Sequence, residues 1–394
     1  MAFPSSFIRT ISTLTTGALG ALPRSIVLVT RETISGSYTP DPLTGLISIT
    51  ASNYEAFYDD NISGAPGVAV DVKNAFAGSV APNTLYVLST GGVAVTSNML
   101  TLANSNPRLW SFISLSSQSR GIDDTSAFFT DAATINSWCT DAREKLFIFT
   151  ASIDADDDTP ELPAQLGAAQ PLRTAAPNTL TCVSNAYEDI DEYTRVYNNP
   201  ILAVMVFVLY GGYVSRSAGS LSDAHDVPGA LGDTFSQTFR NTIEENSLAQ
   251  YNGAKDAGGS LFLYNTQMND DVYEPTTPQI ETKIAQYYTA DYMRVYVRNK
   301  LQAAGQPGVV ANYRDLIKIF AVFNAGLNDC NRVGAIQTNA QGQPDFVAIL
   351  KSEADVDALD PSWRTTGKYP VGAISAQIRY YAAGHYLPLV LQGV

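Results

Sequence analysis

Histidine and cysteine are scarce in this 394-residue chain. Its two histidines, His225 and His385, leave little material for acid–base or metal chemistry that depends on imidazole. The three cysteines, Cys139, Cys182 and Cys330, are far apart and form no CxxC pair. We therefore expect buried free thiols, and neither a disulfide framework nor a structural zinc site.

Catalytic signatures are also absent. No HExxH, GxSxG, Walker A or GxGxxG motif occurs. The acidic run at residues 154–158 departs from a calcium-binding EF-hand loop at the required glycine and at the final glutamate. Neighbouring carboxylates such as Glu244 and Glu245 could be imagined as a glycosidase pair, but such neighbours on surface turns are usually just hydrated. The sequence therefore predicts no catalytic residue, no metal site and no cofactor.

Charge is low and of one sign. Charged residues make up 16% of the chain, the net charge is −14 and the pI is about 4.5. A low charge content fits a subunit that buries much of its exterior against copies of itself, and the acidity argues against nucleic-acid binding. The most apolar run, residues 201–210, is shorter than the roughly 20 residues that span a bilayer. We expect it to be a buried helix or strand, and we expect no membrane insertion and no signal peptide.

Both ends of the chain have the pattern of extended arms. Residues 374–382 alternate, so that Ile378 and Tyr380 share one face of a strand, and a second strand-like run follows at 387–391. The edges of such a strand must be paired by its own domain or by another subunit, and we interpret it as an arm that another copy completes. Residues 2–20 are rich in Ser and Thr, with spaced apolar side chains, and also predict an extended arm.

From residue 53 to residue 150, helical and strand patterns alternate, which predicts an α/β layer with a largely parallel sheet. Residues 151–180 are a breakpoint rich in Asp and Pro, and a further strand follows it. The predicted helices are 54–58, 68–76 and 124–142, and the predicted strands are 26–29, 46–50, 84–89, 110–115, 146–150 and 178–183.

Two helices follow. One begins at Thr277–Pro278 and ends at Gly305; the other is capped by Asn312, with Asp315 three residues on, and ends at Gly334. Between residues 281 and 332 there are seven basic and four acidic residues, in a chain of strongly negative net charge. These are either ordinary solvated helix faces or a docking face for an acidic partner.

In this arrangement the chain resembles the tail sheath proteins of contractile-tailed bacteriophages and the related sheaths of pyocin-like injection systems. The resemblance is a series of blocks through most of the chain. They are residues 81–87 (APNTLYV), Trp138 through the strand 146–150, the glycines at 253 and 258–259 before the helix at Pro278, and the helix pair with the β arm that ends at Val394.

The resemblance implies a two-domain, tail-sheath-like α/β (α+β) fold with a discontinuous C-terminal core domain and extended β arms. It places the arms at 1–20 and 375–394, an outer domain at 21–235 and an inner core domain at 236–374. The arm residues expected to form strands with neighbouring subunits are Phe3, Phe7, Ile11, Ile378, Tyr380, Leu387 and Leu389. The residues expected to face the tube are Arg294, Arg298, Lys300, Arg314 and Lys318.

The function that the resemblance implies is structural. Such subunits stack as hexameric rings around a tail tube and contract to drive the tube through the host envelope. The expected partners are other copies of the chain, the tube protein, and baseplate and tail terminator proteins, in a virion assembled in the host cytoplasm. The alternatives are a non-contractile virion subunit of the tube, baseplate or capsid, and, more remotely, a virion-associated glycosidase.

Overall fold

The computed structural model describes residues 25–380, with gaps at 79, 118–126, 142–144, 155–160, 167–177, 211–225, 247, 254–260, 265–279, 304–311 and 333–334. The chain forms two compact units. The large unit contains the described residues up to Lys283, and the small unit contains those from Ile284 onward. Each unit is described by itself.

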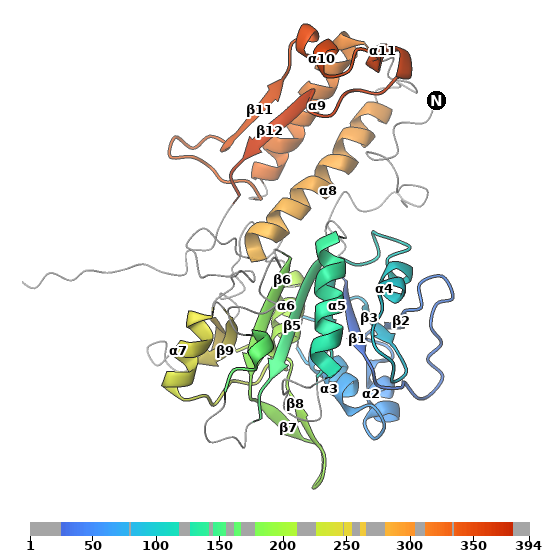
Figure 1. Ribbon diagram of the computed structural model, residues 1–394, viewed down its shortest axis with the longest axis vertical. Helices are drawn as coiled ribbons and strands as arrows, with labels where there is room; N and C mark the ends of the chain where they lie inside the picture. Colours follow the sequence, from blue (N-terminus) through green and yellow to red (C-terminus); the bar gives the residue numbers. More distant parts are fainter. Residues whose placement is uncertain are drawn as a thin grey trace, which may run out of the picture. The chain divides into compact units, whose positions relative to one another are not determined.

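An eight-stranded sheet forms the centre of the large unit, in the order β10-β9-β6-β5-β4-β1-β3-β2 (Figure 1). The strands from β3 to β9 in this order are parallel, and β2 and β10 are antiparallel at the two ends. The predicted largely parallel α/β layer is therefore confirmed. The strands are β1 (Ile26–Thr30), β2 (Ile47–Ile49), β3 (Leu85–Ser89), β4 (Phe112–Leu115), β5 (Leu146–Ser152), β6 (Thr179–Ser184), β9 (Ala249–Gly253) and β10 (Leu261–Tyr264).

Helices lie on both faces of this sheet. They are α2 (Tyr54–Asn61), α3 (Pro66–Ala75), α4 (Ser97–Ala103), α5 (Ala127–Asp141), α6 (Pro200–Tyr210) and α7 (Gln237–Glu245), with a 3₁₀ turn at Ala164–Leu166. Residues of α4, α5 and α7 form one core cluster with alternate side chains of the strands, among them Phe147 and Phe149. Thr150 points to the other face, where its hydroxyl donates to Asn199 just before α6 (2.8 Å). A hairpin of β7 (Tyr187–Asp189) and β8 (Arg195–Tyr197) is separate from the sheet.

Coverage on both faces explains the composition of the central elements. All seven residues of β5 are buried, as expected for a parallel strand that has helices on both sides. The apolar run at 201–210, for which the sequence left helix and strand open, forms α6. Nine of the eleven residues of this helix are buried, because a helix that is hydrophobic all round belongs in a core.

Buried carboxylates hold helices to the carboxyl ends of three strands. Asp131 of α5 pairs with Arg31 after β1 (2.5 Å), and Asp233 accepts a hydrogen bond from Ser184 at the end of β6 (2.6 Å). Asp71 of α3 accepts one from the Ser117 backbone N–H after β4 (2.7 Å). This edge of a parallel sheet is where α/β proteins bind ligands. Here side chains of the chain itself occupy it at these three strands.

The small unit consists of a helix pair and a two-stranded sheet with two short helices. Its elements are α8 (Ile280–Ala303, with its first turn in the large unit), α9 (Tyr313–Arg332), β11 (Phe346–Leu350), α10 (Glu353–Leu359), α11 (Trp363–Thr366) and β12 (Ile374–Ile378). The division between the two units lies after β9 and β10, because these strands belong to the large sheet. The sequence predicted the boundary near residue 235, before these strands. The assignment of outer and inner layers stays a prediction.

Helices long and apolar enough to cross a membrane are not found in the described part of the chain.

A glycine in the first turn of α3 allows this helix to approach the end of β4. A Cβ atom on Gly67 would collide with the carbonyl oxygen of Ser117. We therefore predict that Gly67→Ala lowers the free energy of unfolding by about 1–3 kcal/mol, although alanine is the better helix former by about 1 kcal/mol.

Urea unfolding would measure this change. The matched control is Gly64→Ala, where the added Cβ would meet only the Ser35 hydroxyl at 3.8 Å. The control should keep wild-type stability, and equal stability of Gly67→Ala would contradict the prediction.

Candidate assembly surface

The terminal strand β12 has the predicted alternation and a partner within its own chain. Ile374, Ala376 and Ile378 are half-buried, whereas Ser375 and Gln377 are exposed. The strand pairs antiparallel with β11, with Phe346 opposite Ile378 and Leu350 opposite Ile374. The alternation predicted for residues 374–378 is thus confirmed. One edge of this strand is paired within its own chain, by β11, and the completion of the arm by another copy stays a prediction.

One face of this small sheet packs on the helix pair. Phe346, Ala348, Ala376 and Ile378 contact a core that is built from α8 and α9 and includes Met293, Leu327 and Cys330. The other face is open, and Val347 and Ile349 expose 58% and 45% of their surface there. The sheet therefore has one face packed on the helix pair and one face exposed to solvent.

The two outer edges of this sheet are its most distinctive feature. No strand of the described chain pairs with β11 or β12 on the side away from the other. Two strands alone are marginally stable in water, and an open edge presents N–H and C=O groups to another strand. Backbone pairing of this kind is the usual way in which an extended segment adds to a sheet. The small sheet can therefore accept strands.

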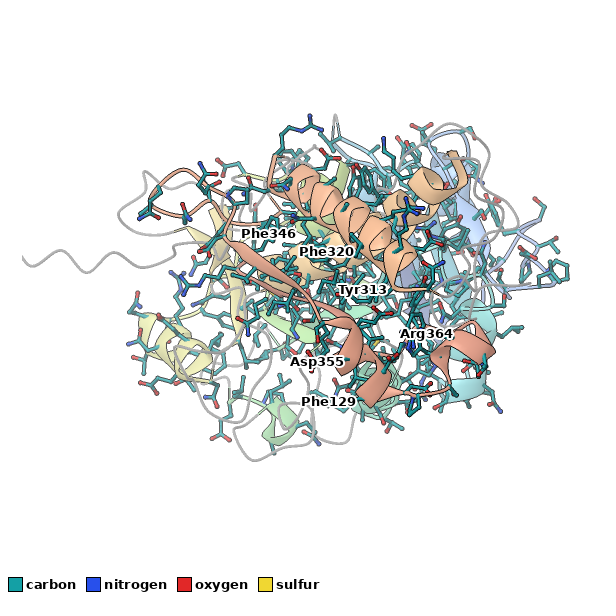
Figure 2. All side chains as sticks on the ribbon, turned by 90° about the horizontal axis from the view of Figure 1, so that it is seen from above. Phe129, Tyr313, Phe320, Phe346, Asp355 and Arg364 are labelled. Carbon is teal, nitrogen blue, oxygen red and sulfur yellow. The ribbon has the colours of Figure 1, made fainter. Side chains whose placement is uncertain are left out.

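Side chains of α9, α10 and α11 pack at the end of the sheet where β11 leads into α10. Figure 2 labels Tyr313 of α9 and Arg364 of α11. Trp363 of α11 is fully buried and donates its indole N–H to Asp357 (2.7 Å). Arg364 lies over the Trp363 ring and pairs with Glu353 (2.6 Å) and Asp357 (2.8 Å). No sequence pattern predicted this role of Trp363.

Two tyrosines join this end of the sheet to α9. The Tyr313 hydroxyl donates to the Lys351 carbonyl (2.8 Å), and the Tyr369 hydroxyl donates to the Asn312 carbonyl (3.2 Å). The start of α9 also has the predicted cap, in which Asn312 accepts from the Asp315 backbone N–H (2.8 Å). Helix α9 and the sheet are therefore joined at this end by polar contacts as well as by packing.

The predicted arm residues have different positions. Ile378 is half-buried in the small-unit core, and Tyr380 forms an isolated antiparallel bridge with Ile336. Burial raises the pKa of the Tyr380 hydroxyl to about 12. Phe3, Phe7, Ile11, Leu387 and Leu389 lie outside the described residues. The contacts of all seven with other copies stay predictions.

The predicted tube-facing cations are brought together only in part. Arg314 and Lys318 are exposed one turn apart at the start of α9, with the half-exposed Ile317 beside them. Lys318 pairs with Asp315 (2.7 Å) and lowers the pKa of that carboxyl. Lys300 is exposed near the end of α8, and its ammonium lies 5.5 Å from the centre of the Tyr296 ring. The side chains of Arg294 and Arg298 lie outside the described residues.

The position of one of these cations on α9, Arg314, is unfavourable for the helix itself. The N-terminal end of a helix carries a partial positive charge, so Arg314 in the first turn is unfavourably placed and Asp315 offsets that charge. Lys318 lies beyond the first turn and pairs with Asp315. The exposure of Arg314 and Lys318 makes them available to an acidic partner.

Metal-binding clusters of three or more His, Cys, Asp or Glu residues are not found within the described ranges. Both histidines lie outside those ranges, and the three cysteines are buried free thiols. Burial raises the pKa of the Cys330 thiol to about 12 and that of Cys139 and Cys182 well above its usual value. These thiols are therefore protonated and unreactive at neutral pH.

No family model and no curated protein sequence matches this chain. Solved structures do. The PVC sheath complex of an extracellular contractile injection system, in its contracted state, contains a chain with a TM-score of 0.60 at 11% identity, over 100% of this chain and 98% of that one. The anti-feeding prophage baseplate contains one with a TM-score of 0.59 at 11% identity, over 98% of both chains. A sheath tail protein from Listeria innocua has a TM-score of 0.49 at 8% identity, over 87% of this chain and 90% of its own.

The likeness to the first two structures extends over nearly the whole chain, and at this identity it concerns the fold. The predicted resemblance to contractile sheath proteins is confirmed at that level.

Opposite faces of β12 give a matched pair of substitutions. We predict that Ile378→Asp destabilises the small unit by at least about 2 kcal/mol, because it places a charge in the core that contains Met293 and Leu327. Gln377→Asp adds the same charge to the exposed face and should leave stability unchanged. Hydrogen exchange of the α9 and β11 amides would separate the two, and equal protection in both variants would contradict the assignment of the faces.

Proposed function

We propose that this chain is the sheath subunit of a contractile phage tail or a related injection system, with a structural role and no enzymatic one. The observation that carries the proposal is the small sheet, which packs on a helix pair and to which no further described strand is paired on either outer edge. A fold like that of a chain in a contractile sheath complex, over the whole length, supports it. In this proposal, extended segments from neighbouring copies add strands to β11 and β12 and link the subunits into a continuous mesh.

The rest of the proposed assembly follows from this linkage. Hexameric rings of subunits stack around a tail tube and change from an extended to a contracted packing, while the added strands stay paired. Backbone pairing suits such a change, because it does not depend on side-chain identity and tolerates rotation of the linked bodies. Baseplate and tail terminator proteins would bound the stack in a virion or similar particle.

Electron microscopy of the protein expressed alone would test self-assembly. We predict long hollow tubes with a regular helical surface. A variant that lacks residues 381–394 should form none and yet keep the wild-type circular dichroism spectrum, because β12 ends at Ile378 and Tyr380 is the last residue with a described bridge. A truncation that cuts into β12 would also remove its pairing with β11, so a loss of tubes in that variant would reflect damage to the small sheet and not the missing arm. Tubes of normal appearance from the truncated protein would contradict the proposal.

A second candidate is a structural subunit that does not contract, since one of the similar chains belongs to a baseplate structure. It differs from a sheath in having a single lattice. Tubes of one geometry under every triggering condition would favour this candidate, and two helical geometries of the same subunit would exclude it.

The start of α9 is the proposed contact with the tube. We predict that the double substitution Arg314→Glu and Lys318→Glu prevents co-assembly with the tube protein, because it reverses two exposed charges without touching the core. The single substitution Arg332→Glu, at the other end of α9 and also exposed, is the control and should retain co-assembly. Sedimentation of mixed assemblies would measure both. Loss of tube binding in the Arg332→Glu variant alone would mean that the tube does not contact the start of α9.

A further inference from the structure

The order of strands in the large sheet reverses between β1 and β4. From β1 the chain continues to β3 on one side, and later to β4, β5 and β6 on the other. Glu32 follows the carboxyl end of β1, and Ser117 follows that of β4. In α/β proteins, this reversal opens a crevice between neighbouring carboxyl ends. Here two carboxylates lie at this point, the half-buried Glu32 and the buried Asp71.

Glu32 connects β1 to the start of α3. Its carboxylate accepts hydrogen bonds from the backbone N–H groups of Gly67 (3.0 Å) and Val68 (2.7 Å). These groups belong to the first turn of the helix, where N–H donors lack partners within the helix and the helix dipole favours a negative charge. Glu32 therefore acts as an internal anion that holds α3 on the sheet.

Asp71 connects the next turn of α3 to β4. Its side chain is 1% exposed and accepts hydrogen bonds from the backbone N–H of Ser117 (2.7 Å) and from the Ser117 hydroxyl. Asn199, just before α6, donates to Asp71 at 3.4 Å and to the Leu115 carbonyl at 2.9 Å. A Cβ atom added to Gly67 would meet both the Ser117 carbonyl oxygen and the Glu32 carboxylate, so both residues lie close to the same point of α3. The two carboxylates therefore form one site around Ser117.

Within the described chain, neither carboxylate is hydrogen-bonded to a cation. All of their hydrogen-bond donors are N–H groups, hydroxyl groups or an amide. A buried negative charge beside a half-buried one is unfavourable without a cation, and a bound proton relieves it. Burial raises the pKa of Asp71 to about 7, with a further contribution from the charge of Glu32, and burial also raises the pKa of Glu32.

The charged residues on the surrounding elements have other contacts or are exposed. Arg31 pairs with Asp131, Lys73 lies over the Tyr58 ring, and Arg195 lies over the Tyr187 ring and pairs with Asp189. The carboxylates of α2, which packs on α3, are those of the exposed residues Glu55, Asp59 and Asp60. The other groups around Asp71 are Ser117 after β4, Thr150 of β5 and Asn199 before α6.

We propose that Glu32 and Asp71 form a proton-sensitive latch, which holds α3 on the carboxyl ends of β1 and β4 at acidic pH and loosens as the pH rises to neutral. Asp71 binds a proton more tightly in the folded chain than in the unfolded one, so its contribution to stability is complete below the ordinary pKa of an aspartate, about 4. That contribution decreases as the pH rises and is lost by about pH 7.

Hydrogen exchange of α3 in the full-length protein, from about pH 4 to about pH 9, would test the latch. Protection factors of peptides within residues 66–75, corrected for the intrinsic exchange rate, should decrease by up to about tenfold per pH unit between about pH 4 and about pH 7 and then level off. Asp71→Asn keeps the shape and the acceptor for Ser117 but cannot ionise, so its protection should be independent of pH in this range. A flat wild-type profile, or an Asp71→Asn profile as steep as that of the wild type, would overturn the proposal.

Two further variants keep the test decisive. Glu32→Gln removes the neighbouring charge, so the fall in protection should level off at a lower pH than in the wild type. If Asp71→Asn does not fold, an unchanged Glu32→Gln profile overturns the proposal. Glu188→Gln is the matched control, because Glu188 accepts a hydrogen bond from Asn74 near the other end of α3 (2.8 Å) and should leave the profile unchanged.

Discussion

The small unit depends on the need of every strand to pair its backbone N–H and C=O groups. β12 meets this need on one side through β11, and α9 supports both strands from one face. The buried Trp363 and the bonds from Tyr313 and Tyr369 fix one end of this arrangement. The result is a supported two-stranded sheet whose other backbone groups, as far as the described chain shows, lie unpaired along its two outer edges, and the proposed function is the use of those edges.

The large sheet has the opposite design at its ends. β2 is only three residues long, and both end strands are antiparallel to their neighbours. Short edge strands discourage addition of further strands. Helices cover both faces, and the chain's own carboxylates occupy the edge where related α/β layers bind ligands. The chain thus separates a closed layer from a sheet that can be extended, and an assembly linked through the small sheet does not compete with pairing at the large one.

Local patterns predicted the elements well, and non-local pairing limited the rest. The alternation of β12, the Asn312 cap of α9 and the parallel α/β layer follow from periodicity and capping within short windows, and each is confirmed. The partner of β12 lies about 30 residues earlier across two short helices, and no local signal assigns that pairing. For the same reason, the membership of β9 and β10 in the large sheet was not foreseen. The residues around Ser117 come together only through the fold, since Glu32, Asp71 and Asn199 lie on three separate elements.

A sheet of only two strands gives the small unit a stability that depends on its surroundings. In a polymer of the proposed kind, each subunit would gain a third and fourth strand from its neighbours, and those strands bind the folded small unit but not the unfolded one. By mass action, the melting temperature of the small unit would then rise with protein concentration, while that of the large unit would not. Folding of the small unit and growth of the polymer would thus be a single equilibrium, in which the neighbouring copies complete the small sheet.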